Sequence, residues 1–188
     1  MSFFKKRGVA WVLAVILVTA ATTTSVDAKL GRKAGDVIDG FYDGVYVDGY
    51  QQRGIGSHLS NLCSYADSLC IIADGYGYDT EDASWASEAL KLAMLYSRED
   101  ISYIYYDYAD LLSALEKLTY QLQRADLSER DAASLEQYVS SIGETKSAIE
   151  ASGYNATVRE FMRKYSHFPA DFMADFADVK MPEYFGHM

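Results

Sequence analysis

The stretch that decides the fold runs from Ile101 to Leu122 and reads ISYIYYDYADLLSALEKLTYQL. Its apolar residues recur at alternating steps of three and four positions, which is the spacing of a helix face that packs along other helices. The residues on this face are Ile101, Ile104, Tyr108, Leu111, Leu115, Leu118 and Leu122. We therefore predict one long amphipathic helix over this stretch.

Neighbouring stretches repeat this pattern on both sides. Apolar residues have helical spacing from Ile55 to Ala73, from Thr80 to Met94, from Leu135 to Ile149 and from Tyr154 to Tyr165. Residues 74–78, DGYGY, break the first of these helices, and Ser128 has the position of an N-cap for the third. The apolar stripe shifts across Gly153, which predicts a kink or a rotated face there.

These patterns predict an all-α protein, an elongated antiparallel bundle of long helices. The only two prolines, Pro169 and Pro182, lie near the end, so no proline interrupts the earlier helices. No stretch alternates convincingly between apolar and polar residues, so no strand is predicted. Asp-Gly pairs weaken helix formation in residues 29–54, which we expect to be an irregular or short-helix lead-in. The bundle and a C-terminal tail then occupy residues 55–188.

The first 28 residues are organised like a targeting segment. Residues 5–7 are basic, residues 8–21 form an apolar run, and small or polar residues lead to Ala28. This predicts a signal peptide cleaved between Ala28 and Lys29. The alternative is an uncleaved N-terminal segment that anchors the protein in the membrane. Both interpretations place the body of the protein outside the cytoplasmic membrane, either secreted or anchored.

The charge of the chain limits its partners. The formal net charge is −10 and no basic patch is visible, so we expect no nucleic-acid binding. The same charge disfavours docking of the body on anionic lipid, so membrane contact is expected through the N-terminus if it is uncleaved, or through apolar surface.

The chain carries no recognisable catalytic, cofactor or metal motif. Its histidines, His58, His167 and His187, are far apart in the sequence, and none lies in a metal-binding helix motif. The Asp-Gly pairs lack the ligand spacing of an EF-hand, so turn formation explains them better. No nucleophile elbow or phosphate-binding loop occurs. We therefore expect no enzyme activity, no cofactor and no metal site.

Two pairs of residues have both a structural and a functional interpretation. Cys63 and Cys70 are separated by about 10.5 Å of helix rise, too far for a disulfide within one helix. They are either buried apolar residues or partners in an intermolecular bridge. Tyr103 and Tyr106 fall on the flanks of the long helix. They either pack in the bundle, the interpretation that helical spacing favours, or form a possible interaction surface for a peptide or sugar.

A set of residues near the C-terminus has a distinctive order. It consists of Tyr154, Asn155, Val158, Phe168, Pro169, Ala174 and the late aromatic residue Phe185. This set resembles the end of the LemA family and spans residues 154–185. The chain departs from the family at Ser60, where members usually have proline, and at Phe161-Met162, where they have a second Tyr-Asn. It therefore looks like a divergent exported member.

The resemblance implies an antiparallel bundle of long helices on the outer side of the membrane. It implies a structural role for the residues of the motif and brings no catalytic residues with it. Asn155 is expected to bond a neighbouring helix, and Phe168-Pro169 to turn the tail back onto the end of the bundle.

Three functions fit these observations. The first, which we favour, is a non-catalytic scaffold or protein-interaction protein of the cell envelope whose partner is an envelope protein. Self-association into a homo-oligomer is compatible with it. The second is a ligand-binding module for cell-wall fragments or cations. The third and least favoured is a hydrolase whose residues are scattered along the sequence.

Overall fold

The computed structural model describes residues 27–47, 49–167, 174–175 and 178–186, and over these residues the chain is an all-α bundle, as predicted. Its elements, in chain order, are the π-helical turn η1 (Asp27–Gly31), α2 (Arg32–Asp43), β1 (Val45–Val47), β2 (Tyr50–Gln52), α3 (Ile55–Gly75), α4 (Glu81–Tyr96), α5 (Ile101–Leu122), α6 (Glu129–Glu150) and α7 (Tyr154–Tyr165). The helix predicted from Ile101 to Leu122 is α5, with those bounds.

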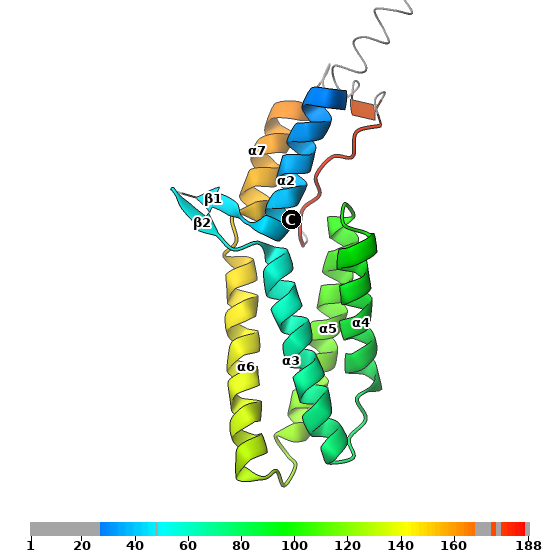
Figure 1. The fold of residues 1–188 in the computed structure, drawn as a ribbon, viewed down its shortest axis with the longest axis vertical. Helices are drawn as coiled ribbons and strands as arrows, with labels where there is room; N and C mark the ends of the chain where they lie inside the picture. The colour runs from blue at the N-terminus through cyan, green and yellow to red at the C-terminus, as the bar shows by residue number, and fades with distance from the viewer. Residues whose placement is uncertain (1–26, 48, 168–173, 176–177, 187–188) are drawn as a thin grey trace, which may run out of the picture.

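The helices form two parts, one above the other, in an elongated molecule (Figure 1). In the lower part, α3 packs against α4 and α6, and α5 packs against α4. In the upper part, α2 packs beside α7, and the segment 178–186 runs back toward the start of α5. The first and last described segments of the chain therefore lie together.

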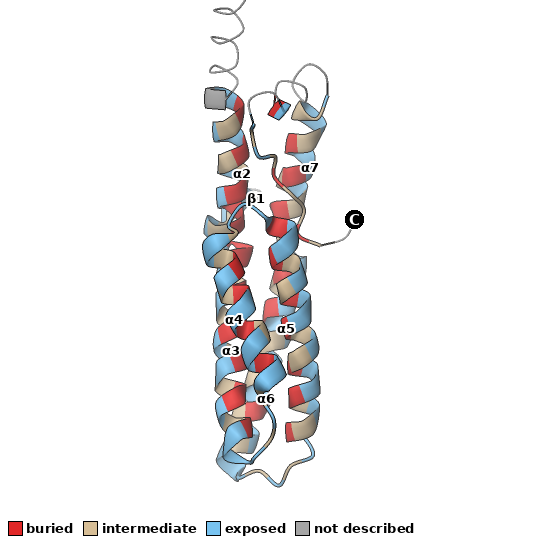
Figure 2. Cartoon of the chain, turned by 90° about the vertical axis from the view of Figure 1, so that its right-hand side faces the viewer, coloured by how far each residue is buried: buried red, intermediate tan, exposed pale blue. Residues whose placement is uncertain are grey.

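The buried residues lie on the inward faces of these helices (Figure 2). The face predicted for α5 is buried throughout, and Ile104, Leu111 and Leu122 are fully so. Phe41 of α2 is also fully buried in the main core, so residues 29–54 contribute to the core as well as preceding it. No helix in the described part of the chain has the length and apolar character needed to cross a membrane.

A short hairpin joins the two parts. Strands β1 and β2 pair antiparallel, with Val47 opposite Tyr50. The expectation that no strand would form was wrong at this point. Each strand has only 3 residues, too few for an alternating pattern to stand out. The signal that was present is the pair Asp48-Gly49, because Asp-Gly favours a tight hairpin turn, and Gly49 has a φ of 83°.

Two glycines allow the sharp path from α2 through the hairpin to α3. Gly44 has a φ of 97°, and a Cβ there would lie 1.9 Å from the carbonyl oxygen of Gln52. A Cβ on Gly54 would lie 2.2 Å from the carbonyl oxygen of Tyr42. A side chain at either position would push neighbouring backbone apart, so both positions require glycine.

The break predicted at Gly153 is present, and the hairpin braces it. Helix α6 ends at Glu150 and α7 begins at Tyr154. Between them, the Gly153 N–H donates to Oε1 of Gln52 on β2 at 3.0 Å. At the other end of α6, Ser128 is the predicted N-cap, since its hydroxyl accepts a hydrogen bond from the Asp131 N–H at 3.2 Å.

Candidate functional site

Several residues of the LemA-like motif meet around the segment 178–186. The Tyr154 hydroxyl donates to the carbonyl oxygen of Glu183 at 2.9 Å. Asn155 Nδ2 donates to the carbonyl oxygen of Phe185 at 2.9 Å, and the Phe185 N–H donates to Asn155 Oδ1 at 2.9 Å. Burial raises the pKa of Tyr154, so its hydroxyl stays protonated and able to donate.

Phe185 fills the space between α2, α5 and α7. Its ring centroid lies 5.3 Å from that of Phe41, 5.2 Å from that of Tyr105 and 5.4 Å from that of Tyr108. The side chain is only 6% exposed. Tilted and edge-on ring contacts of this kind add to the free energy gained from burial. The C-terminal segment is therefore part of the core.

Polar contacts fasten the same segment to the start of α5. Glu183 Oε2 accepts hydrogen bonds from the Ser102 N–H at 3.0 Å and the Ser102 hydroxyl at 2.7 Å. The Lys180 ammonium lies 2.6 Å from Asp100 and 3.3 Å from Glu183. Burial opposes the charge on Glu183, but the hydrogen bonds from Ser102 and Lys180 outweigh it and lower the pKa of Glu183.

The remaining motif residues divide between two clusters. Val158 is fully buried in the main core, whereas Ala174 packs with Phe161 and α2 in a second, smaller core. Phe168 and Pro169 lie outside the described residues. Asn155 bonds the backbone of the C-terminal segment rather than the neighbouring helix that the resemblance implied, because that segment fills the position beside α7. We call the contacts of Tyr154, Asn155 and Glu183–Phe185 the tail latch.

The residues of the predicted cleavage position lie in the turn before α2. Ala28 and Lys29 both belong to η1, which continues directly into α2.

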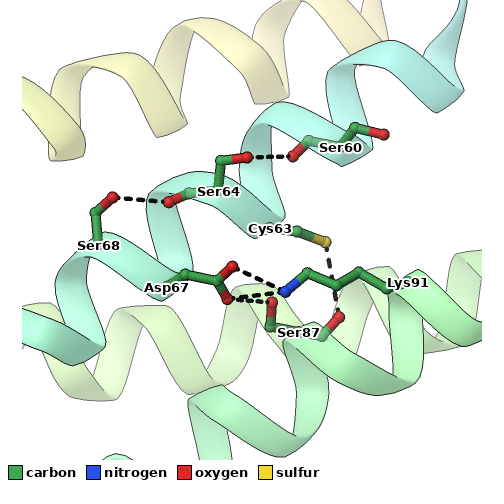
Figure 3. Close-up of polar contacts among 7 residues, drawn as sticks. All are labelled: Ser60, Cys63, Ser64, Asp67, Ser68, Ser87 and Lys91. Carbon is green, nitrogen blue, oxygen red and sulfur yellow. Dashed lines mark hydrogen bonds and ion pairs between the residues drawn. The ribbon is translucent and has the colours of Figure 1, made fainter.

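A polar cluster joins α3 to α4 (Figure 3). Asp67 of α3 accepts hydrogen bonds from the Ser87 hydroxyl at 2.9 Å and from the Lys91 ammonium at 2.8 and 3.0 Å, both on α4. Ser87 is only 1% exposed. The Cys63 thiol donates to the Ser87 carbonyl oxygen at 3.8 Å. The cluster places a thiol, a hydroxyl, an amine and a carboxylate close together.

The protonation states of the cluster do not suit nucleophilic catalysis, which needs a thiolate or a neutral amine. Burial raises the pKa of the Cys63 thiol to about 11. The hydrogen bond to Asp67 raises the pKa of Lys91, which therefore stays charged at neutral pH. The geometry instead supports a structural role, in which Asp67 satisfies the buried Ser87 hydroxyl and ties α4 to α3.

Cys63 and Cys70 are both free and both buried on α3. They lie on one continuous helix, the geometry that prevents a bridge between them. Their burial supports the interpretation as apolar packing residues and does not favour an intermolecular disulfide.

A groove between α4 and α5 is the best candidate for a binding site. It has a volume of about 580 Å³ and is lined in part by small residues, namely Ala86, Ala89, Ser113 and Ala114. The larger residues along it are Glu81, Asp82, Trp85, Asp107, Asp110 and Lys117. The Trp85 side chain is 69% exposed. The groove therefore combines an exposed indole with several carboxylates.

The charges in this groove are unbalanced. Lys117 is paired with Asp82 at 2.6 Å. Asp107 Oδ2 is buried and has no hydrogen-bond partner among the described residues. Burial, and then the nearby charge of Asp110, raise the pKa of Asp107. The negative charge of Asp107 is therefore unfavourable in the folded protein, even though this side chain lines an open groove.

Exposed aromatic residues extend the groove toward the α4–α5 loop. Tyr103 and Tyr106 are 54% and 55% exposed, and their spacing puts them on the same face of α5 as Asp107 and Asp110. About half of each of these two side chains is therefore exposed, although the Tyr106 ring also contacts that of Tyr105 at 6.2 Å, whereas Tyr108 is buried. On α4, Leu92 and Tyr96 are also exposed, and helical spacing places both on the same side of the helix as Trp85. We call the groove together with Trp85, Leu92, Tyr96, Tyr103 and Tyr106 the α4–α5 face.

The sequence drew attention to part of this face only. Helical spacing singled out Tyr103 and Tyr106, but it gave no reason to group the carboxylates of the groove with them. The missing information was the pairing of α4 with α5, which brings Glu81 and Trp85 beside Asp110 and Lys117.

The two histidines in the described part of the chain lie on different segments. His58 lies on α3 and His167 follows α7, while His187 is outside the described residues. Over the described part of the chain, no three His, Cys, Asp or Glu side chains are placed to hold a metal ion.

Comparison with family models, with curated proteins and with solved structures gives no match for this chain.

Proposed function

We propose that this chain is a non-catalytic scaffold or adaptor of the cell envelope that binds another envelope protein through its α4–α5 face. The signal-like N-terminus supports a position outside the cytoplasmic membrane. The motif residues that gather in the tail latch support a distant relationship to the LemA family, with a structural role for the motif.

The exposure of large side chains on the α4–α5 face carries this proposal. Trp85 is 69% exposed, Tyr96 is 78% exposed, and Tyr103 and Tyr106 are about half exposed. Tryptophan and tyrosine are enriched at the energetic centres of protein interfaces, because they bury a large rigid area at small entropic cost. An exposed group of such residues on one face is typical of an interaction surface.

A site-specific photo-cross-linking experiment in intact cells tests the proposal. A photo-reactive phenylalanine derivative replaces Tyr106 on the face or, as a matched control, Tyr50 on the hairpin, which is 80% exposed. We expect one recurrent envelope protein to be linked from position 106 and not from position 50. Equal links from both positions, or none from position 106, would contradict the proposal.

A second candidate function is a ligand-binding module for cell-wall fragments or cations. The groove favours it, because an exposed tryptophan beside carboxylates is suited to stacking and hydrogen bonding with a sugar. A thermal-shift panel of glycans, peptides and calcium tests it, since a ligand that binds only the native state raises its apparent stability. No shift with any of them would remove this candidate.

A further inference from the structure

We propose that the partner segment recognised by the α4–α5 face is a basic stretch of protein, rich in arginine and lysine. This inference rests on the proposed function, because it names the chemistry of the partner that docks there.

The groove has more negative charge than its own cations neutralise. Four carboxylates line it, those of Glu81, Asp82, Asp107 and Asp110, against the single ammonium group of Lys117. Lys117 is already paired with Asp82. In the described part of the chain, no lysine or arginine forms a salt bridge with the other three carboxylates. A cationic partner would complement this groove, and the net charge of −10 would favour its approach.

Asp107 is the strongest indication that a partner supplies positive charge to the groove. Its Oδ2 atom is buried without a hydrogen-bond partner among the described residues. A buried carboxylate oxygen without a partner costs free energy. The same side chain lines the groove, so a guanidinium or ammonium group entering there would bring positive charge next to this carboxylate.

The aromatic residues of the face favour arginine and lysine over a bare ion. A guanidinium group can stack on Trp85, Tyr103 or Tyr106 while it bonds a carboxylate nearby. The small residues Ala89 and Ala114 leave room for a chain to lie between the helices. The length of the face from Trp85 to Tyr103 covers several turns of α4, which suits a segment rather than a single side chain.

Other ligand classes fit this face less well. Nucleic acids and anionic lipid surfaces carry the same sign of charge as the groove and would be repelled. A metal ion needs several ligands that converge on one point, and the described residues contain no such group of three. A basic protein segment satisfies the charge, the shape and the aromatic surface together.

The test uses Trp85 as its reporter. The chain has 2 tryptophans, Trp11 and Trp85, so the full-length Trp11→Phe protein reports on the groove alone. The probe is a peptide of about 12 residues, in which arginine or lysine alternates with alanine or leucine to mimic a basic segment. The comparison peptide has glutamine at each basic position. We expect a saturable change in Trp85 fluorescence with the basic peptide and none with the glutamine peptide.

Matched variants separate the groove from the overall charge. The double substitution Asp107→Asn and Asp110→Asn removes two charges from the groove, and Glu144→Gln with Glu160→Gln removes two exposed charges from α6 and α7. We expect the groove variant to weaken peptide binding about tenfold, and the control pair to weaken it less than about twofold. Adding salt should weaken binding to the Trp11→Phe protein and have less effect on the groove variant.

The outcomes distinguish this inference from the function on which it rests. Equal loss in both double variants, or equal binding of the glutamine peptide, would overturn the basic partner. Binding of spermine as tight as that of the peptide would overturn it too, in favour of a small-polycation site. If position 106 still links to an envelope protein at a segment without basic residues, the docking function stands and the partner chemistry is wrong. If position 106 links to nothing, the docking function itself fails.

Discussion

Asn155 holds the backbone of Phe185 with both ends of its side-chain amide. Its Nδ2 donates to the Phe185 carbonyl oxygen at 2.9 Å, and its Oδ1 accepts from the Phe185 N–H at 2.9 Å. A side-chain amide has a donor at one end and an acceptor at the other, so Asn155 satisfies both backbone groups of one residue. The contact fixes the ring of Phe185 between the helices, and the tail latch depends on it.

Replacing Asn155 by alanine should therefore destabilise the protein. The substitution removes two hydrogen bonds and leaves the partly buried backbone groups of Phe185 without partners, which costs about 1–3 kcal/mol. The free energy of unfolding, from urea titration followed by circular dichroism, measures this loss. The control is Asn61→Ala, a substitution of the same kind on α3 outside the latch, which should change stability by about 0.5 kcal/mol or less. Equal effects at the two positions would contradict a specific role for Asn155.

Truncating Phe185 should release the whole C-terminal segment. Phe185→Ala removes a buried ring that contacts Phe41, Tyr105 and Tyr108, and the loss should be about 3 kcal/mol. Phe185→Leu keeps most of the apolar volume and should cost about 1 kcal/mol. Hydrogen exchange should show faster exchange at the start of α5 in the alanine variant than in the leucine variant. Unchanged protection at Ser102 would show that the segment does not depend on its ring.

Glu183 should make the latch sensitive to acid. Its pKa is lower in the folded protein than in the unfolded chain, so its contribution to stability is present above the unfolded-state pKa. That contribution is lost as the pH falls through the folded-state pKa. Glu183→Gln should be less stable than the parent at pH 7, and the difference should shrink at low pH. Thermal melts of the two proteins from pH 7 to pH 3 would show this. A stability difference that grows as the pH falls would contradict a lowered pKa for Glu183.

The sequence predicted those features that depend on local spacing. The apolar face of α5 repeats along one continuous helix, so its bounds and its buried residues could be predicted without knowing what it contacts. The N-cap at Ser128 and the break at Gly153 are also local signals. By contrast, the Asn155–Phe185 contact spans 30 positions, and nothing in the intervening sequence fixes it.

The candidate site was harder to predict for the same reason. Asp107 and Asp110 are unremarkable on a helix surface until α4 is placed beside α5 with Trp85 next to them. The burial of Asp107 Oδ2 depends on that packing as well. Tyr103 and Tyr106 showed that α5 has aromatic flanks, but helical spacing alone did not separate exposed from packed tyrosines. Side chains that act across two helices need the tertiary arrangement.

The polar cluster between α3 and α4 offers a test of coupling. Asp67→Ala leaves the buried Ser87 hydroxyl without its acceptor and should cost about 1–3 kcal/mol. Ser87→Ala removes the hydroxyl itself, so the double variant has no buried hydroxyl without an acceptor. The double variant should therefore be less destabilised than the sum of the single variants. The control is Lys91→Met, which breaks an exposed ion pair and should cost about 1 kcal/mol or less. Additive losses at Asp67 and Ser87 would contradict the assigned hydrogen bond.

The ionised side chain of Asp107 in the groove should lower the stability of the folded protein. Burial and the charge of Asp110 raise the pKa of Asp107 in the folded protein, so its ionised form destabilises the native state at neutral pH. Glu81, Asp82 and Lys117 line the same groove, and of these three only Lys117 is a cation. Asp107→Asn should therefore raise the melting temperature at pH 7. The gain should disappear as the pH falls through the folded-state pKa, because the native protein then takes up the proton itself.

The same variant links stability to binding. Asp107→Asn should bind the basic peptide more weakly while it melts at a higher temperature, since the charge that disfavours the folded state is the one that attracts the partner. Glu144→Gln serves as the control, because Glu144 is exposed on α6, and it should change neither quantity appreciably. Differential scanning calorimetry and fluorescence titration on the two proteins give both readings. A lower melting temperature for Asp107→Asn would mean that its carboxylate stabilises the fold, and the groove would lose its strongest sign of a cationic partner.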